Sequence, residues 1–417
     1  MWINVDSTIH PRPIAEADVL PTERVAELLG VKPKTVYAYA SRGLLTRVPL
    51  GPGGGGYLRA DVERLKARSD ARAGHGAVAA GALRWGEPVL DAAVSSIDAR
   101  GPAYRGRSAT ELAEHGVSFE RAAELLWSGI LPESVAAWLP VAVPSSRGSF
   151  GSALRGVPGI ARLAVLVANL AAIEARDGPG DRDPARELAR ARSLIARLAA
   201  PGRRAGTVSI ASALLTSLGA TRRGREAAQA LDRALVLSAD HELNASTFAA
   251  RIAAGAGAGL YACILAAVAT LSGTRHGGQC DVVESLLDEI GAPARAARMV
   301  RDRLARGEIL PGFGHPLYPA GDPRTQPLLD AARAIAPREV RVVDALVGAV
   351  EDATGQKPVV DLALVALARA IGARRGSATL VFAVGRSAGW TAHILEQRAA
   401  GFILRPRARY VRTPPPR

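Results

Sequence analysis

Apolar residues recur at helical spacing along most of the chain beyond residue 83. The segments are rich in alanine, leucine and arginine, and Gly, Pro and Asp separate them. This pattern predicts helices over residues 108–127, 160–176, 184–200, 225–237, 281–304, 326–351 and 360–374. Alternating β-branched runs are nearly absent, so the pattern predicts a mainly α fold for this part of the chain.

Shorter elements are predicted before that helical region. The segment 22–30 (TERVAELLG) predicts a helix with Thr22 as its N-cap and Gly30 as the left-handed residue after its end. A tight turn leads into a second helix over roughly 33–42, followed by two short strands around the glycine run 51–56. A phosphate-binding loop is the alternative for this run, but the Lys-Ser/Thr that such a loop needs does not follow it.

This order of helix, turn, helix and wing resembles the MerR/excisionase type of DNA-binding domain over residues 20–68. The resemblance predicts a small winged helix-turn-helix domain over residues 1–72 and a small-residue linker over 73–82. Five polar or amphipathic residues of the second helix are the predicted DNA contacts: Lys34, Thr35, Tyr37, Ser41 and Arg42. The alternatives are that this domain contacts another protein or that it is a degenerate remnant of a DNA-binding domain.

The composition is that of a globular protein with a large core. The 417 residues suggest two or three domains, and 48% of them are hydrophobic and 22% charged, which excludes wholesale disorder. Two cysteines exclude a disulfide scaffold and favour a reducing compartment. The first 20 residues lack the pattern of a signal peptide, so we expect a cytoplasmic protein.

The net charge of +14 is spread along the chain. Residues 1–72 carry 11 basic and 8 acidic residues, which leaves 42 of the 53 basic and 31 of the 39 acidic residues for the remainder. The excess is therefore not a concentrated nucleic-acid-binding tail. It fits anionic small substrates at least as well as DNA, and arginine suits bidentate carboxylate binding.

Residues 252–274 contain no charged residue. Their length allows a membrane crossing. However, the segment is rich in Gly and Ala and lacks aromatic anchors at both ends. The sequence therefore predicts a buried helix here, and we expect no membrane association.

Three of the seven histidines stand in marked polar or glycine-rich contexts. They are His241 in ADHELNAST, His276 in RHGGQCD and His315 in GFGHPLYPAGDPR. Glycines beside two of them allow a ligand to approach closely. Asp361 enters an apolar helical run, where an unpaired charge is costly, although an N-cap is the alternative for this residue. No His or Cys pair has zinc-ligand spacing, so we expect no metal site.

These motifs are part of a longer series in the same order along the chain. The series is SSID…YRGRSATELAEHGVSFERAAELLWSGILP (95–132), ADHELNAST (239–247), HGG (276–278), GFGHPLY with DPR (312–324), FAVGRSAGWTAHILEQ (382–397) and LRPR (404–407). It resembles the citrate synthase family. The resemblance implies a large helical domain over 83–275 and 376–417, a small helical domain over 276–375 that closes over the site, and a homodimer.

The resemblance also implies roles for individual residues. Asp361 would remove a proton from the methyl carbon of acetyl-CoA, His276 would donate a hydrogen bond to the thioester oxygen, and His315 would polarise the ketone of oxaloacetate. The substrate carboxylates would be held by His241, Arg324, Arg386 and, from the other subunit, Arg405. Several arginines around one small polyanion are chemically reasonable, because each guanidinium fork fixes orientation as well as charge.

The implied function is condensation of acetyl-CoA or propionyl-CoA with oxaloacetate to give citrate or 2-methylcitrate and CoA, with no permanently bound cofactor. Three positions depart from the family pattern: Pro316 replaces Arg or Lys, Cys280 replaces Asn, and Leu362 replaces an aromatic residue. They put the choice of substrate and the rate in question. The alternatives are cleavage of a citryl thioester and a transcriptional regulator that senses a carboxylate or an acyl-CoA.

Overall fold

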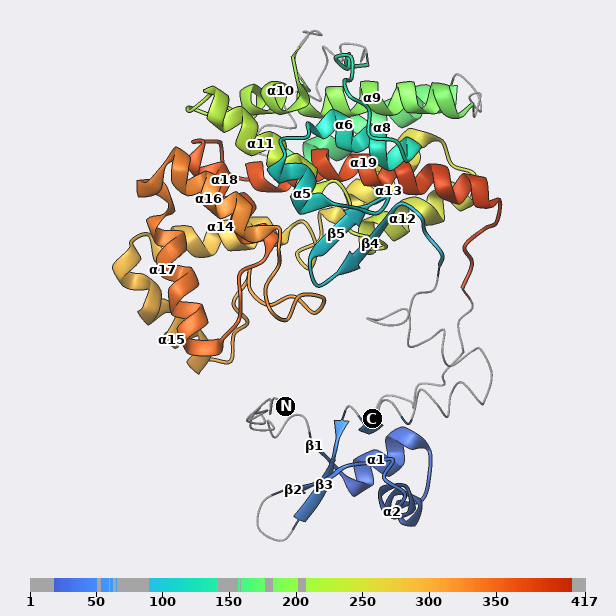
Figure 1. The fold of residues 1–417 in the computed structure, drawn as a ribbon, viewed down its shortest axis with the longest axis vertical. Helices are drawn as coiled ribbons and strands as arrows, with labels where there is room; N and C mark the ends of the chain where they lie inside the picture. The colour runs from blue at the N-terminus through green and yellow to red at the C-terminus, as the bar shows by residue number, and fades with distance from the viewer. Residues whose placement is uncertain are drawn as a thin grey trace, which may run out of the picture. The chain divides into compact units, whose positions relative to one another are not determined.

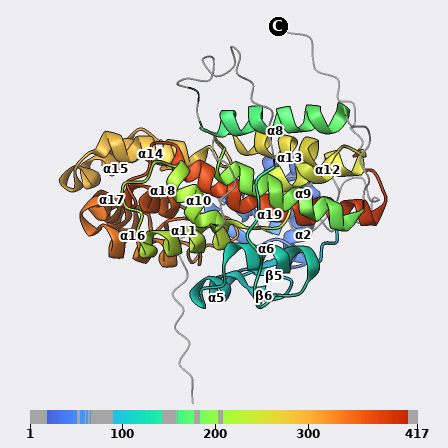
Figure 2. The ribbon, with the colours of Figure 1, turned by 90° about the horizontal axis from the view of Figure 1, so that it is seen from above.

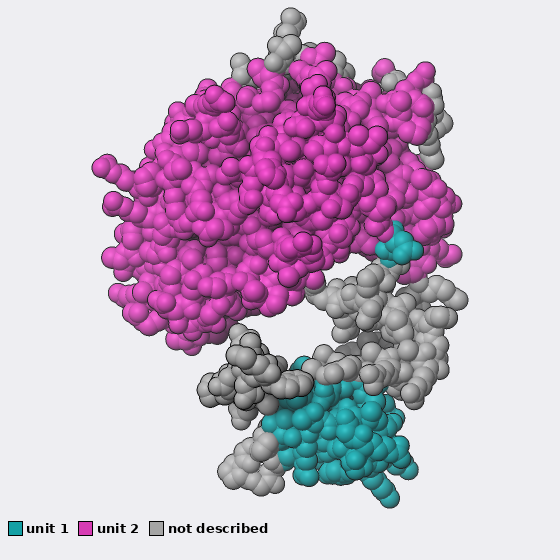
Figure 3. Space-filling model, in the orientation of Figure 1, with its two compact units in different colours: residues 1–91 teal, residues 92–417 magenta. Residues whose placement is uncertain are grey.

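The chain forms two compact units, residues 1–91 and residues 92–417, which Figure 3 shows in different colours. The structure is a computed structural model (Figure 1). It describes residues 19–50, 54–59, 61, 62, 65, 90–141, 157, 159–176, 183–201 and 208–406. The predicted linker, 73–82, lies outside the described residues, and the predicted division of the larger unit into large and small domains remains a prediction.

The described part of the smaller unit includes three strands and two complete helices, and residues 59, 61, 62 and 65 are also helical. Its elements are β1 (Val19–Pro21), α1 (Thr22–Leu29), α2 (Pro33–Ser41), β2 (Arg47–Leu50) and β3 (Gly54–Leu58). The strands form an antiparallel sheet in the order β1-β3-β2. The two helices and the hairpin were predicted, whereas β1 was not. A separate apolar cluster holds the unit together: Leu20, Val25, Ala26, Val36, Leu45, Tyr57 and Val62.

The end of α1 agrees with the prediction, but its start does not. Gly30 has φ 65°, and its backbone N–H bonds to the carbonyls of the last turn. Pro21, not Thr22, occupies the N-cap position and gives no side-chain cap. The chain arrives from β1 in an extended conformation that includes Pro21, so the helix begins with the side chain of Thr22 buried.

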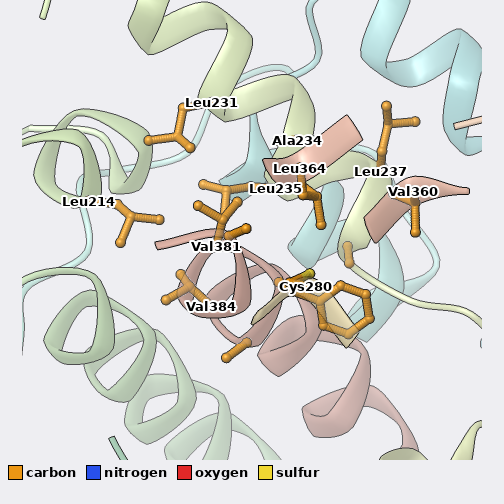
Figure 4. Packing of buried hydrophobic residues seen from close by; sticks show 14 of the residues in the cluster. Leu214, Leu231, Ala234, Leu235, Leu237, Cys280, Val360, Leu364, Val381 and Val384 are labelled. Atoms are coloured by element: carbon orange, nitrogen blue, oxygen red, sulfur yellow. The ribbon is translucent and has the colours of Figure 1, made fainter. Parts of the chain in front are cut away.

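The larger unit begins with an antiparallel sheet that the sequence did not predict. Its strands are β4 (Ser95–Asp98), β5 (Gly101–Tyr104) and β6 (Arg107–Ser108), in that order. Helices follow: α5 (Ala109–Glu114), α6 (Phe119–Ser128), α8 (Gly159–Arg176), α9 (Pro184–Ala199), α10 (Ile210–Ser217), α11 (Arg225–Ser238), α12 (Ala245–Gly255), α13 (Leu260–Leu271), α14 (Gln279–Ile290), the 3₁₀ turn η2 (Pro293–Arg295), α15 (Ala296–Ala305), α16 (Thr325–Ile335), α17 (Pro337–Thr354), α18 (Val360–Ala370) and α19 (Ser377–Ala400). Figure 4 shows part of their shared core, where α10, α11, α14, α18 and α19 meet.

Several predicted long helices are interrupted in the structure. Gly116 separates α5 from α6, Gly257 lies between α12 and α13, and Gly291 ends α14, each with a positive φ that favours glycine. The single helix predicted for 252–274 is therefore wrong. Within the described ranges, no helix has the length and hydrophobicity that a bilayer crossing requires.

Helix α19 lies in the middle of the helical unit (Figures 1 and 2). It packs against α6, α8, α9, α11, α12, α13, α14 and α18. Gly389 permits the closest approach, since its N–H donates to the carbonyl of Ala239 at 3.0 Å. A Cβ atom at this position would overlap Ala239 and Asp240. Because Gly389 has no side chain, the segment after α11 lies directly on α19 at this position.

Candidate active site

The segment between α11 and α12 carries His241, and buried polar contacts hold this segment in place. The carboxylate of Asp240 accepts a hydrogen bond from Ser95 and lies 3.2 Å from Nε2 of His393, a residue of α19. Burial alone would raise the pKa of Asp240, but His393 and the hydrogen bonds hold it below its usual value. Tyr104 donates to the carbonyl of Val236 at 2.8 Å. These contacts fix the backbone before His241, and the backbone N–H of Glu242, which donates to Ser95 Oγ at 3.2 Å, fixes it after His241.

His241 is buried, and its Nε2 lies 2.9 Å from the hydroxyl of Tyr318. Its ring centroid is 5.6 Å from that of His315. Burial lowers the pKa of His241 well below its usual value, and the charges of Arg324 and Arg386 lower it further. His241 is therefore a neutral imidazole near two guanidinium groups.

His315 and Tyr318 lie on the loop before α16 and face each other across an isolated β-bridge. Their ring centroids are 5.0 Å apart. The backbone N–H of Leu317 donates to Nδ1 of His315 at 3.1 Å. Burial, followed by the charge of Arg324, lowers the pKa of His315, so the neutral ring carries its proton on Nε2, where it is a hydrogen-bond donor.

His276 lies in the glycine turn before α14, as the sequence suggested. Its Nε2 is 2.8 Å from Oγ of Ser246, and burial lowers the pKa of His276 to about 4. The Ser246 hydroxyl accepts from Trp390 Nε1 at 3.1 Å and has Asn244 Oδ1 as a second acceptor at 2.8 Å. The hydroxyl has one proton to give. When it donates to His276, that ring is neutral with its proton on Nδ1; when it donates to Asn244, the ring carries its proton on Nε2 and donates to the hydroxyl.

Asp361 lies in the first turn of α18 and is not the N-cap, which is Val359. The N-cap alternative is therefore wrong. The thiol of Cys280 is 3.4 Å from Oδ1 of Asp361. Burial raises the pKa of Asp361, and the Cys280 hydrogen bond and the charge of Arg324 act in the opposite direction. A desolvated carboxylate of this kind is a stronger base than one in water.

The two buried arginines of the site differ in how they are compensated. Arg324 donates Nε and Nη2 to the two oxygens of Asp322 at 2.9 and 2.8 Å, so much of its fork is already occupied. Arg386 is 1% exposed, donates Nε to the carbonyl of Ser238 at 2.8 Å, and has its guanidinium 4.6 Å from the ring of Phe382. No described carboxylate forms an ion pair with it. Burial lowers the pKa of Arg386 to about 10, while the charge of Asp240 opposes this effect.

The structure thus brings together six of the seven predicted site residues: His241, His276, His315, Arg324, Asp361 and Arg386. Arg405 is exposed after α19, and its predicted role in another subunit remains a prediction. Sequence reasoning missed Tyr318, Asp322 and Ser246 as parts of the site, although all three stand inside the motifs around the histidines. Among the described residues, no group of His, Cys, Asp and Glu is arranged to hold a metal.

This arrangement suits chemistry next to a carbonyl group. A carboxylate with a raised pKa can remove a proton from carbon, and neutral imidazoles can donate hydrogen bonds to the oxygens on which negative charge develops. Arg386, a buried cation without a carboxylate partner in the described part of the chain, would be compensated by an anionic ligand.

Comparison with known proteins identifies related sequences. A family model for the C-terminal domain of citrate synthase matches residues 82–407. The 2-methylcitrate synthase of Mycobacterium tuberculosis (strain H37Rv) is 30% identical over 331 residues, which cover 74% of this chain and 84% of that protein. Citrate synthase 2 of Bacillus subtilis (strain 168) is 37% identical over 187 residues, which cover 44% of this chain and 50% of that protein, so this match spans half the length of the relative.

Solved structures show the same likeness. The ternary complex of citrate synthase from the archaeon Thermoplasma acidophilum with carboxymethyl coenzyme A and oxaloacetate has a TM-score of 0.69 and 25% identity, covering 79% of this chain and 95% of that one. Citrate synthase from Thermotoga maritima MSB8 has a TM-score of 0.66 and 26% identity, covering 79% and 94%.

Proposed function

This chain belongs to the citrate synthase family, a family of acyl-transferring enzymes, and from that premise we propose that it condenses acetyl-CoA or propionyl-CoA with oxaloacetate. The products are citrate or 2-methylcitrate and CoA. The CoA thioester is a substrate in this scheme, and no permanently bound cofactor takes part. A homodimer, in which Arg405 reaches the site of the other subunit, is part of the same proposal.

The convergence of Asp361 with neutral His276 and neutral His315 beside Arg386 carries this proposal. The methyl group of a thioester is a very weak acid. A carboxylate can remove its proton only if the oxygen of the developing enol is stabilised at the same time. A desolvated carboxylate and a neutral imidazole are suited to these two tasks, which supports the proposal.

The reaction then proceeds in three steps. Asp361 takes a proton from the methyl carbon while His276, in the tautomer in which Ser246 donates to its Nε2, donates from Nδ1 to the thioester oxygen, which gives an enol. The enol carbon attacks the ketone carbon of oxaloacetate, the enol proton returns to Nδ1 of His276 as the thioester carbonyl forms again, and His315 gives its Nε2 proton to the new alkoxide. Water then cleaves the thioester and releases CoA. His241, Arg324 and Arg386 hold the carboxylates in place, Arg324 through the part of its fork that Asp322 does not occupy.

The test is a thiol-release assay with acetyl-CoA and propionyl-CoA against oxaloacetate. Wild-type protein should release CoA with at least one of them, and Asp361→Ala should lower turnover by about 10²- to 10⁴-fold, the usual scale for loss of a general base. Asp352→Ala, which changes an exposed aspartate of α17, is the matched control. Wild-type turnover in Asp361→Ala would refute the assignment. Binding of citrate without any CoA release would favour the regulator alternative.

We also propose that the smaller unit binds DNA through the exposed face of α2. Lys34, Tyr37 and Arg42 are exposed on this helix or at its end, with Ser41 also exposed and Thr35 partly so. Cationic and hydroxyl side chains on one short helix suit phosphate and base contacts. Full-length protein should shift a DNA duplex in a low-salt gel, and Lys34→Ala should weaken the shift. No shift of any duplex at low salt would refute this second proposal.

A further inference from the structure

Cys280 is a buried thiol in direct contact with the carboxylate that the proposed function makes the base. It lies in the first turn of α14, with no exposed surface, among the same apolar side chains as Leu364 and Val384 (Figure 4). Its Sγ is 3.4 Å from Oδ1 of Asp361 and 4.0 Å from the carbonyl oxygen of that residue. A thiol in this position has one strong acceptor within reach.

The direction of this hydrogen bond follows from the protonation state of the thiol. Burial, together with the neighbouring charge of Asp361, raises the pKa of Cys280 well above its usual value, so the sulfur keeps its proton and donates. Oδ1 of Asp361 is thereby occupied. The backbone N–H of Asp361 also donates to this carboxylate, but no side chain of the described part donates to Oδ2, so we take that oxygen as the one that receives a proton from a substrate.

We propose that Cys280 is a positioning residue, whose Sγ–H holds Oδ1 of Asp361 and thereby presents Oδ2 to the substrate. This inference rests on the proposed function of Asp361 as the base. A thiol is a weak donor, so it orients the carboxylate while stabilising the anion less than an amide or hydroxyl donor would. The contact therefore combines a fixed geometry with a base that stays strong.

Besides Cys280, three titratable groups from neighbouring elements act on Asp361. The titratable groups facing it are Cys280 of α14, Asp322 and Arg324 at the start of α16, and Arg386 of α19. Arg324 and Arg386 are cations that favour the ionised carboxylate, and Asp322 opposes it. None of these three changes when Cys280 is replaced, so a shift seen in a Cys280 variant reports on the thiol contact.

The first test is the pH dependence of kcat/KM in full-length protein. Cys280→Ala removes the donor, destabilises the ionised carboxylate and should move the acid limb to higher pH by about half to one unit. Cys280→Ser retains a donor, so its limb should stay at or below the wild-type position. Cys263→Ala is the matched control, because it removes the other buried thiol, on α13, and should leave the limb unchanged.

The proposal would be overturned if the acid limb of the pH profile stayed in place in Cys280→Ala. Equal shifts in Cys280→Ala and Cys280→Ser, or a shift in Cys263→Ala, would overturn it as well.

The second test does not depend on turnover. The infrared S–H stretching band that Cys280→Ala removes should shift when Asp361→Asn alters its acceptor, while the Cys263 band stays in place. A Cys280 band that does not respond to Asp361→Asn would overturn the contact itself. If the band responds to Asp361→Asn but the wild-type protein releases no CoA, the contact is supported and the proposed function is refuted. The two failures are therefore distinguishable.

Discussion

Replacing Arg386 by methionine should stabilise the free protein while removing its affinity for oxaloacetate. Burial lowers the pKa of Arg386 to about 10, against an ordinary value near 12.5. A cation whose pKa is lowered on folding destabilises the folded state wherever it is charged, which here includes all pH values below about 10. The difference corresponds to roughly 3 kcal/mol at neutral pH.

The substitution also removes favourable contacts. The hydrogen bond from Nε to Ser238 contributes about 1 kcal/mol, and the cation–π contact with Phe382 contributes about 0.5–1 kcal/mol. The net change is about 1 kcal/mol in favour of the free variant, so its Tm should rise by about 1–3 °C. Binding of oxaloacetate should weaken by ~10²- to 10³-fold, because charge-assisted hydrogen bonds to a carboxylate are lost.

Thermal unfolding with and without oxaloacetate measures both effects, since a ligand raises Tm only if it binds the folded state. Arg251→Met is the matched control. Arg251 is equally buried, but it is paired with Glu396 at 2.8 Å and with Gln397 at 3.0 Å, so its loss should destabilise the protein by about 3–5 kcal/mol. A large drop in Tm for free Arg386→Met, or an undiminished rise in its Tm with oxaloacetate, would refute this reasoning.

Three further substitutions test neighbouring parts of the site. Burial holds the pKa of His276 at about 4, so the contribution of the neutral ring to the free energy of unfolding is fully present above the ordinary histidine pKa and is lost as pH falls toward 4. His276→Gln should therefore flatten the pH dependence of the free energy of unfolding, measured in urea. The same pH dependence in the variant and the wild type would contradict the assignment. Tyr318→Phe removes the hydroxyl beside His241, so the free energy of unfolding should fall by about 1 kcal/mol and KM for oxaloacetate should rise, whereas unchanged values of both would show that the contact has no role. Asp322→Ala leaves Arg324 buried without its partner and should cost about 3–5 kcal/mol in chemical denaturation; a loss below about 1 kcal/mol would disprove the importance of the pair.

The sequence singled out residues that the structure brings together, but it did not predict their contacts. Each histidine stands in a short motif that is visible without a structure, and so does the Asp322–Arg324 pair, whose members are two residues apart. The contact between Cys280 and Asp361 joins residues 81 positions apart. Such a pair depends on how α14 packs on α18, which local patterns do not specify.

The fold was predictable in class but not in several elements. Helix α19 was missed because it is buried on all sides, so its sequence lacks the apolar and polar faces that mark a surface helix. The strands β4 to β6 were missed because they are short and contain Ser, Gly, Pro and Ala in place of β-branched alternation. Glycines with positive φ also interrupt helices that the spacing of apolar residues had predicted as continuous.

Gly389 is an exception to a common rule for stabilising helices by mutation. Exchanging a mid-helix glycine for alanine ordinarily gains about 1 kcal/mol, which makes such sites attractive in thermostabilisation campaigns. Here the added methyl group would push α19 away from the peptide that carries His241. A library that randomises this codon should therefore return glycine alone among active clones, and propensity-based redesign of α19 would damage the centre it aims to strengthen.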